Sequence, residues 1–251
     1  MSGFVCLMYH DVFNKTKHES GFSGRDADVY KIDKRSFENQ VRHINDFLIK
    51  KGLDKGLVRF TFDDGGESFL TVIAPTLEKY GFKGYFFIAT GFLNKEGFLS
   101  DEQVAELSKR GHFVGSHSHT HRQMMNALSK EELLSDWKTS IDYLGLLIGK
   151  PILIASLPNG FSSTVILDVL QDLGIEDVYT SSPIDKPAKK GKLTLFGRYG
   201  IKDGMSERKV LHIAFNPLTK TMIKMKKIIL KGAKSLLGQQ YIKIREYLYK
   251  H

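Results

Sequence analysis

The sequence contains a single cysteine, Cys6, among 251 residues, which excludes a framework of internal disulfide bonds. It also lacks any run of roughly 18 apolar residues, the length that a membrane-spanning helix needs. The opening residues, MSGFVCLMYHDV, lack the basic start, apolar core and small-residue cleavage site of a signal peptide. No short internal repeat or low-complexity segment is found. These absences favour a cytoplasmic globular protein, and the length is enough for a full hydrophobic core.

Acidic residues are nearly missing from the C-terminal part of the chain. Residues 216–251 contain nine lysines and arginines and one acid, Glu246, so their net charge is 9 − 1 = +8. The whole chain has 37 basic and 28 acidic residues, which leaves 28 basic and 27 acidic residues, a net charge of +1, in residues 1–215. We therefore distinguish a nearly neutral body, residues 1–215, from a basic tail, residues 216–251.

Short β-branched and aromatic runs alternate with longer segments of helical periodicity along the body. The expected strands are residues 4–9, 57–62, 84–89, 112–116, 152–156 and 177–181, with a weaker one at 192–200. The expected helices are residues 34–50, 68–81, 99–111, 129–149 and 163–174. Such alternation is typical of βαβ units around a parallel sheet, and about seven units predict an α/β fold with a closed or nearly closed barrel.

Local signals support the helix boundaries. Two capping boxes are expected, Ser100 with Gln103 and Ser129 with Glu132. Three glycines stand where helices should end, at positions 81, 111 and 174. The one long irregular stretch of the body, residues 11–30, follows the first strand, and loops of that length are usually functional or disordered.

Acids and histidines follow three of the expected strands. The stretch RFTFDDGGES ends the second expected strand with two adjacent carboxylates. The first expected strand ends in MYHDV, and the fourth ends in GSHSHTH. Because the loops after the strands form the active face of a (β/α) barrel, we expect these side chains to converge. Two histidines and one carboxylate are the ligands of an open catalytic zinc site or of a non-haem iron site. One aspartate can then bind the metal while the other takes a proton from water.

The motifs TFDDG and HSHTH resemble the first two motifs of the polysaccharide deacetylases, the NodB-homology carbohydrate esterases, whose second motif is H-[ST]-x-x-H. The resemblance extends over about residues 3–215 and includes the helix and strand of LSDEQVAELSKRGHFVGS. It implies a deformed (β/α) barrel and a metal-dependent hydrolase that removes N- or O-acetyl groups from amino sugars. It also implies that Asp63 is the general base and that a divalent metal, expected to be Zn²⁺, is bound by Asp64, His117 and His121. His119 falls on a variable position of the motif.

The chain departs from the third family motif, R-x-P-x-G. The segment SLPNG keeps Pro158 and Gly160 but has Ser156 in place of the arginine that normally holds the catalytic aspartate. We expect Arg198, in FGRYG, to supply this charge from another direction.

The last family motif is a leucine followed by the histidine that protonates the leaving amine. The N-terminal LMYH fits the form L-x-x-H with His10, whereas His212 lies in a segment of helical character. The chain resembles the exopolysaccharide deacetylase branch, in which this strand comes first, and we therefore expect His10 to be the general acid. Pro158, Gly160 and Tyr30 are expected to contact the sugar, and the loop 12–34 is expected to cover it.

The resemblance implies an N-acetylated sugar or glycan as the substrate, in polymeric, nucleotide-linked or lipid-linked form. Three alternatives remain open at this point. An amidohydrolase acting on a cyclic amide or ureide would use the same ligands. A non-haem iron oxygenase would share the ligand set but would not need Asp63. A catalytically inactive carbohydrate-binding relative would account for the missing arginine.

The tail has the periodicity of an amphipathic helix. Its lysines line one face, and its apolar residues line another; the lysines are 220, 224, 227, 231 and 234, and the apolar residues are Met222, Met225, Ile229, Ala233 and Leu236. Such a helix can pack on the barrel with its lysines in solvent. It can also lie on an anionic membrane through residues 218–250, on the inner face, where each lysine contributes about 1 kcal/mol. Nucleic-acid binding is not expected, because no aromatic residue is interleaved with the lysines before Tyr241.

Overall fold

The computed structural model describes residues 4–122, 124–160 and 162–237. Its centre is a nine-stranded sheet in the order β11-β1-β4-β5-β6-β7-β8-β10-β9, in which only β9 and β10 pair antiparallel. The strands are β1 (Val5–Tyr9), β4 (Val58–Phe62), β5 (Gly84–Ile88), β6 (Phe113–Ser116), β7 (Ile154–Ser156), β8 (Asp177–Tyr179), β9 (Ala188–Lys190), β10 (Leu193–Phe196) and β11 (Tyr199–Gly200). The α/β class and the first six expected strands are confirmed.

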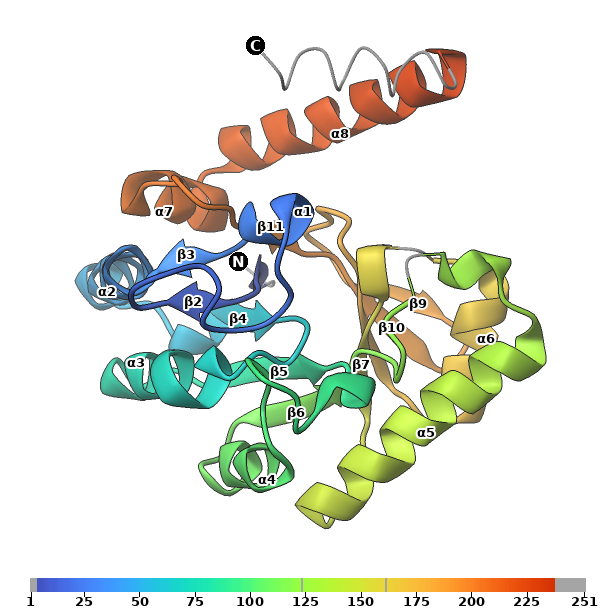
Figure 1. The fold of residues 1–251 in the computed structure, drawn as a ribbon. Helices are drawn as coiled ribbons and strands as arrows, with labels where there is room; N and C mark the ends of the chain where they lie inside the picture. The colour runs from blue at the N-terminus through green and yellow to red at the C-terminus, as the bar shows by residue number, and fades with distance from the viewer. Residues whose placement is uncertain (1–3, 123, 161, 238–251) are drawn as a thin grey trace.

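The sheet curls into a deformed barrel that remains open on one side (Figure 1). The prediction of a single strand over residues 192–200 is wrong, because that segment forms β10 near one end of the sheet and β11 at the other end. Only Gly197 and Arg198 connect the two strands, and a chain of that length spans at most about 11 Å. The two ends of the sheet therefore approach each other, and Arg198 lies in the link between them.

Helices surround the sheet and bury its outer face (Figure 1). They are α2 (Lys34–Lys51), α3 (Ala74–Lys79), α4 (Asp101–Lys109), α5 (Lys130–Ile148), α6 (Thr164–Asp172) and α7 (Glu207–Phe215), and a π-helical segment, η2 (Phe69–Ile73), precedes α3. Both expected capping boxes, at Ser100 and Ser129, are present with both of their hydrogen bonds. The three glycines expected at helix ends have left-handed φ angles between 70° and 82°.

The segment after β1 is more ordered than the sequence predicts. Instead of one irregular loop, it contains a two-stranded parallel sheet, β2 (Val12–Phe13) with β3 (Ile32–Asp33), and a helical turn, α1 (Arg25–Asp28). Val12 and Ile32 are buried in the main core. Both ends of this segment are therefore anchored, and its middle part is held over one end of the barrel.

The basic tail begins with the helix α8 (Pro217–Leu237), and residues 238–251 lie outside the described part of the chain. Lys220 and Lys224 contact Asp185, and Lys227 donates hydrogen bonds to the backbone oxygen of Ser181 and to the Ser182 hydroxyl. The expectation of a helix packed with its lysines in solvent is wrong for Lys220 and Lys224, which are partly buried against the body, whereas Lys227 is exposed although its amine reaches the body. Within the described residues, no helix has the length and apolar character needed to cross a bilayer.

Candidate functional site

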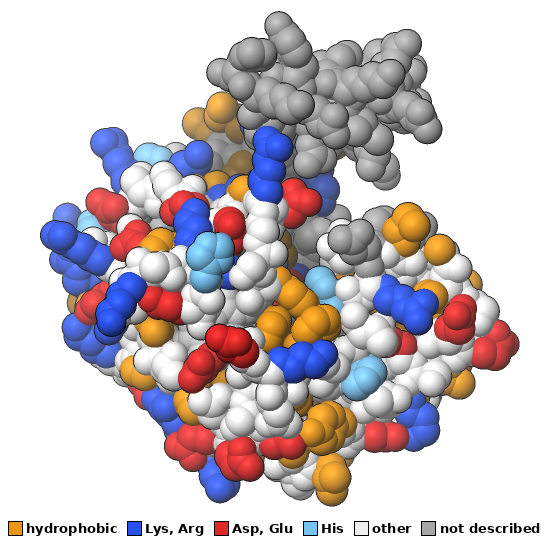
Figure 2. Space-filling view, in the orientation of Figure 1, with side chains coloured by type: hydrophobic (Ala, Val, Ile, Leu, Met, Phe, Trp, Pro, Cys, Tyr) orange, Lys and Arg blue, Asp and Glu red, His pale blue; other side chains and the backbone are white. Residues whose placement is uncertain are grey.

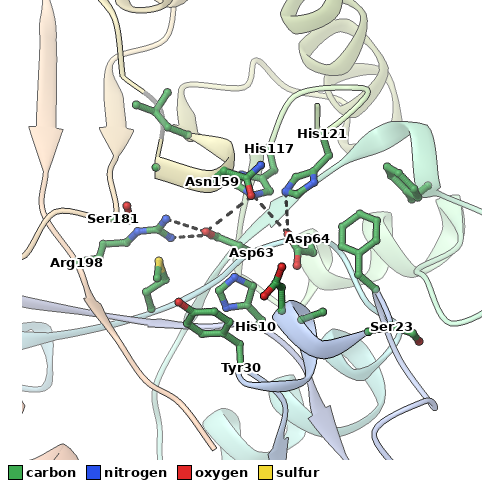
Figure 3. A pocket seen from close by; sticks show the side chains of 18 of the residues that line it. His10, Ser23, Tyr30, Asp63, Asp64, His117, His121, Asn159, Ser181 and Arg198 are labelled. Carbon is green, nitrogen blue, oxygen red and sulfur yellow. Dashed lines mark hydrogen bonds and ion pairs between the residues drawn. The ribbon is translucent and has the colours of Figure 1, made fainter. Parts of the chain in front are cut away.

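The polar residues predicted from the strand ends meet in one cavity of about 640 Å³. Strands β1, β4 and β6 run in parallel, so their carboxyl ends open at the same end of the barrel and present the side chains that follow them (Figure 3). The cavity is lined by Met8, His10, Phe22, Ser23, Gly24, Arg25, Asp26, Ala27, Tyr30, Asp63, Asp64, Phe92, His117, His121, Leu157, Asn159, Gly160, Ser181 and Arg198.

Asp64, His117 and His121 form a candidate metal centre. Their ligand atoms all lie within 4.8 Å of one another. Asp64 Oδ1 is 3.5 Å from His117 Nε2 and 3.3 Å from His121 Nε2. Ligands at zinc distances in a tetrahedral arrangement are about 3.3 Å apart, so this donor set fits Zn²⁺. The carboxylate and the two imidazoles leave room for further ligands, as in catalytic zinc sites.

The orientation of His117 is set by a hydrogen bond. Its Nδ1 is 2.9 Å from the backbone oxygen of Ser156. A carbonyl oxygen only accepts, so Nδ1 carries a hydrogen, and Nε2, which faces Asp64, is the nitrogen at which a metal would replace a proton. An outer hydrogen bond of this kind holds a histidine in the tautomer that binds a metal.

Two of the three candidate ligands have left-handed backbone conformations, with φ of 91° at Asp64 and 49° at His121. Such conformations cost about 1–3 kcal/mol each for a residue other than glycine. Local hydrogen bonds hold them: the amide of Ala89 donates to the Asp64 carbonyl, and the amide of His121 donates to the Ser118 hydroxyl. The strained backbone positions are therefore those at which the candidate ligands converge.

Burial and mutual charge set the protonation of the candidate ligands. Burial, together with the nearby charge of His117, lowers the pKa of His121 to about 4. Burial alone would raise the pKa of Asp64, but hydrogen bonding to His117 and the histidine charges hold it below its usual value. At neutral pH, His121 is therefore neutral and Asp64 is ionised, which are the forms that bind a metal.

Asp63 pairs with Arg198, and its Oδ2 also lies 3.9 Å from His117 Nε2 (Figure 3). The guanidinium donates two hydrogen bonds to the carboxylate, Nη1 to Oδ1 at 2.6 Å and Nη2 to Oδ2 at 2.7 Å. Ser156 Oγ donates to Asp63 at 3.1 Å and accepts from Arg198 Nη2 at 2.8 Å. The expected contact between Arg198 and Asp63 is thus present, and the small Ser156 side chain takes part in it.

Both members of this pair are buried, with 1% of Arg198 and 3% of Asp63 exposed. Burial would raise the pKa of Asp63, but the charges of Arg198 and His117 outweigh it and hold the pKa well below its usual range. Asp63 is therefore an ionised acceptor at neutral pH.

His10 lines the cavity on the opposite side of the two carboxylates from His117 and His121 (Figure 3). Its ring lies 4.6 Å from the ring of Tyr30, and its buried Nδ1 has no hydrogen-bond partner among the described residues. His212 lies in α7 and does not line the cavity. Of the two histidines considered for the last motif, the structure brings only His10 to the site.

The other predicted site residues are placed as follows. Tyr30 and Gly160 line the cavity, whereas Pro158 is buried and is not among its lining residues, and the expected contacts of these three residues with the sugar stay a prediction. His119 is turned toward Thr90, with Nδ1 2.9 Å from the threonine hydroxyl, and lies outside the metal centre.

Sequence reasoning missed several cavity residues. Asn159 has a left-handed φ of 55° and is exposed at the cavity wall, and Ser181, Arg25 and Asp26 also line it. Asn159 is the variable position of the third motif, and an asparagine before a glycine is a signal for a left-handed turn that could have identified it. Ser181 lies in a loop, and Arg25 and Asp26 lie in the short helix α1; none of the three belongs to a recognisable motif, so only the fold brings them to the cavity.

The loop over the cavity is tied to the segment that follows Asp64. Asp11, which is buried, accepts hydrogen bonds from the hydroxyls of Ser20 at 2.6 Å and Ser68 at 2.8 Å. A Cβ on Gly66 would lie 1.8 Å from Asp11 Oδ1, so the second glycine of DDGG is required for this contact. Asp11 is therefore a structural link between the two loops and does not line the cavity.

Comparison with known proteins identifies the site. The family model described as polysaccharide deacetylase matches residues 50–178, which include both aspartates and both histidines of the candidate centre. The chain belongs to the polysaccharide deacetylase family. This deacetylase is therefore a hydrolase that acts on acetylated carbohydrate, and the resemblance seen in its motifs is confirmed.

Individual relatives support the fold. YxkH of Bacillus subtilis (strain 168), named as a polysaccharide deacetylase, is 24% identical over 214 residues, covering 80% of this chain and 72% of YxkH. The Streptococcus pyogenes deacetylase PplD has a TM-score of 0.71 at 22% identity, covering 84% of this chain and 98% of PplD. IcaB from Ammonifex degensii has a TM-score of 0.62 at 22% identity, covering 79% and 91% of the two chains.

The buried pair predicts a specific loss of stability. In metal-free protein, Arg198→Met leaves the Asp63 carboxylate buried without its partner, which typically costs about 3–5 kcal/mol. Because the pKa of Asp63 is lowered on folding, the contribution of the pair is present at neutral pH. It is lost as the pH falls below the unfolded-state value of about 3.9 toward the folded-state pKa. Urea unfolding at pH 7 measures the cost.

Asp63→Asn provides the control background, because it removes the buried charge. There the Arg198→Met substitution should cost less than in the wild-type protein. An equal cost in both backgrounds would show that Arg198 stabilises the fold through packing and not through its charge on Asp63.

Proposed function

We propose that this deacetylase hydrolyses the N-acetyl group of an amino sugar, in a glycan or a lipid-linked glycan precursor, using a divalent ion expected to be Zn²⁺. The observation that carries the proposal is the position of an ionised, arginine-bound aspartate directly beside a two-histidine, one-carboxylate centre in one cavity. PplD is described in complex with acetate, the acid that such a reaction releases, which also supports the proposal.

Asp64, His117 and His121 would hold the ion. When bound there, a divalent ion polarises a carbonyl oxygen and lowers the pKa of water. The remaining steps belong to side chains of this chain.

Asp63 is the proposed general base. It takes a proton from the water molecule that attacks the acetyl carbon, so that a C–O bond forms as the proton moves to the carboxylate. The two hydrogen bonds from Arg198 orient Asp63 and keep it ionised before the reaction. They also make it a weaker base, which is compatible with its role because the water pKa is lowered at the same site.

His10 is the proposed general acid. In its protonated form it donates to the amide nitrogen as the C–N bond breaks, which releases acetate and a free amino sugar. Its place across the carboxylates from the metal centre puts it on the side where the leaving nitrogen would lie (Figure 3). A buried nitrogen without a partner costs about 1–3 kcal/mol, and we attribute this cost at Nδ1 to a group reserved for the reaction.

The aromatic residues of the loop after β1 are proposed to bind the sugar. Tyr30 lies beside His10, and Phe22 stacks on His121 with ring centroids 5.0 Å apart. Phe92 and Phe98 hold Phe22 in place through edge contacts. Aromatic faces provide rigid apolar surface in a carbohydrate pocket, whereas Gly160 leaves room on the opposite wall.

An inactive relative is not favoured. The loss of an arginine at position 156 was the reason to consider one, and Arg198 supplies two charge-assisted hydrogen bonds to the same aspartate.

Acetate release tests the proposed function. We expect the purified protein to release acetate from at least one class among N-acetylated oligosaccharides, nucleotide sugars and lipid-linked glycans. A chelator should abolish the release, and added Zn²⁺ should restore it. Hydrolysis of cyclic amides or ureides without acetate release from any sugar would contradict the proposal and favour an amidohydrolase.

Substitutions of the two adjacent aspartates should have different effects on metal binding and activity. Asp64→Asn should lose both bound Zn²⁺ and activity, because it removes a ligand. Asp63→Asn should keep the metal and lose activity by about 10²–10⁴-fold, the usual contribution of a general base. Isothermal titration with Zn²⁺ and initial rates on the best substrate measure the two effects. Equal metal loss in both variants would overturn the assignment of roles.

His10 and His212 form a matched pair for testing the general acid. His10→Ala should lower kcat by about 10²–10⁴-fold, because no acid then protonates the leaving amine. His212→Ala should leave kcat close to that of the wild-type protein. If His212→Ala were the damaging substitution, the general acid would have to be assigned to α7.

A further inference from the structure

The outward face of α8 is an apolar stripe that packs against no core cluster among the described residues. Its members are three or four residues apart and so share one side of the helix. These residues are Leu218 (75% exposed), Met222 (70%), Met225 (56%) and Ile229 (65%). Further along the sequence, Ala233 and Leu236 continue the same spacing. Ile223, on the other side of the helix, packs against the core of the body.

The orientation of α8 is held by polar contacts. Lys220 and Lys224 share the carboxylate of Asp185, which also accepts a hydrogen bond from the Tyr199 hydroxyl. One turn further, Lys227 donates to the backbone oxygen of Ser181. These contacts turn the apolar stripe away from the body. In Figure 2, hydrophobic side chains are visible at the top of the molecule, where Figure 1 places α8.

We propose that this stripe binds the surface of an anionic phospholipid bilayer, with α8 lying in the plane of the interface. A helix with apolar side chains on one face and lysines around it inserts that face between headgroups and acyl chains, and its cations are attracted to anionic lipid. Lys226 is exposed beside the stripe, and Lys231 and Lys234 follow in the sequence.

Charge argues against the two other occupants. A second copy of α8 would bring Lys226, which is exposed beside the stripe, toward another lysine-bearing helix, and residues 217–237 contain no acid that could pair with it. Nucleic acid would satisfy the lysines but would leave the apolar stripe in water, and no aromatic residue precedes Tyr241 in the tail. By contrast, acidic and basic side chains are interspersed on the face of the body that Figure 2 shows, and residues 1–215 carry a net charge of only +1, so the attraction is concentrated in the tail.

The contact would bring the cavity close to the bilayer. Ser181, whose carbonyl binds Lys227, is a cavity residue, and Asp185 follows it in the same loop. This consequence rests on the proposed function: an enzyme held in this way would meet acetylated sugars attached to membrane lipids. Binding itself is measured without turnover, so it succeeds or fails independently of the proposed deacetylation.

Co-sedimentation of the full chain with vesicles tests the proposal. We expect binding to vesicles of phosphatidylcholine mixed with phosphatidylglycerol, weakening as salt is raised, and little binding to phosphatidylcholine alone. Met222→Asp should weaken binding by roughly tenfold or more, because it removes apolar area and adds an acid to the stripe.

Leu146→Asp is the matched control. Leu146 is 80% exposed on α5, away from α8, so the substitution makes the same charge change on another surface and should leave binding unchanged. Circular dichroism and thermal unfolding confirm that both variants are folded. Equal binding by Met222→Asp and the wild-type protein, or equal binding to both vesicle types, would overturn the proposal. So would a dimer in sedimentation equilibrium that Met222→Asp dissociates while vesicles bind neither protein.

Discussion

The ion pair between Asp63 and Arg198 is the interaction on which the architecture of the site depends. Arg198 occupies the short link between β10 and β11, which lie near opposite ends of the sheet, and Asp63 directly follows β4, the third strand from the β11 end. An unpaired arginine could not be buried to 1% exposure at this point. The contact therefore joins the link between the two ends of the sheet to the end of β4 while it orients the proposed base.

The two adjacent aspartates have different roles because successive residues at a strand end point in different directions. Asp63 is directed toward Arg198 and Ser156, and Asp64 is directed toward two histidines from the end of β6. Each carboxylate thus has its own positive partner, which offsets the repulsion between them. The same alternation separates a base that must remain free of metal from a ligand that must bind it.

Loops with little regular structure complete the cavity, and buried contacts hold them. Asp11 joins the loop after β1 to the segment after Asp64, and Phe22 is packed between two other phenylalanines and His121. On the far side, the loop containing Ser181 and Asp185 carries α8. The helix proposed to bind membrane is therefore attached to a loop that also contributes Ser181 to the cavity wall.

Periodicity and local motifs in the sequence determined the α/β class, six strands and the capped helices, because each of these depends on neighbours close in the chain. The candidate metal ligands Asp64, His117 and His121 followed from the resemblance to two family motifs, and the fold brings these side chains together. Tertiary structure decided the rest. The weak strand at 192–200 splits because its two halves pair with strands far apart in sequence, β8 and β1. Pro158 is buried and does not line the cavity, and Arg198 makes the contact with Asp63 that an arginine at position 156 would be expected to make. The amphipathic pattern of the tail predicted a helix, but only contacts with Asp185 and Ser181 decide which of its faces is exposed.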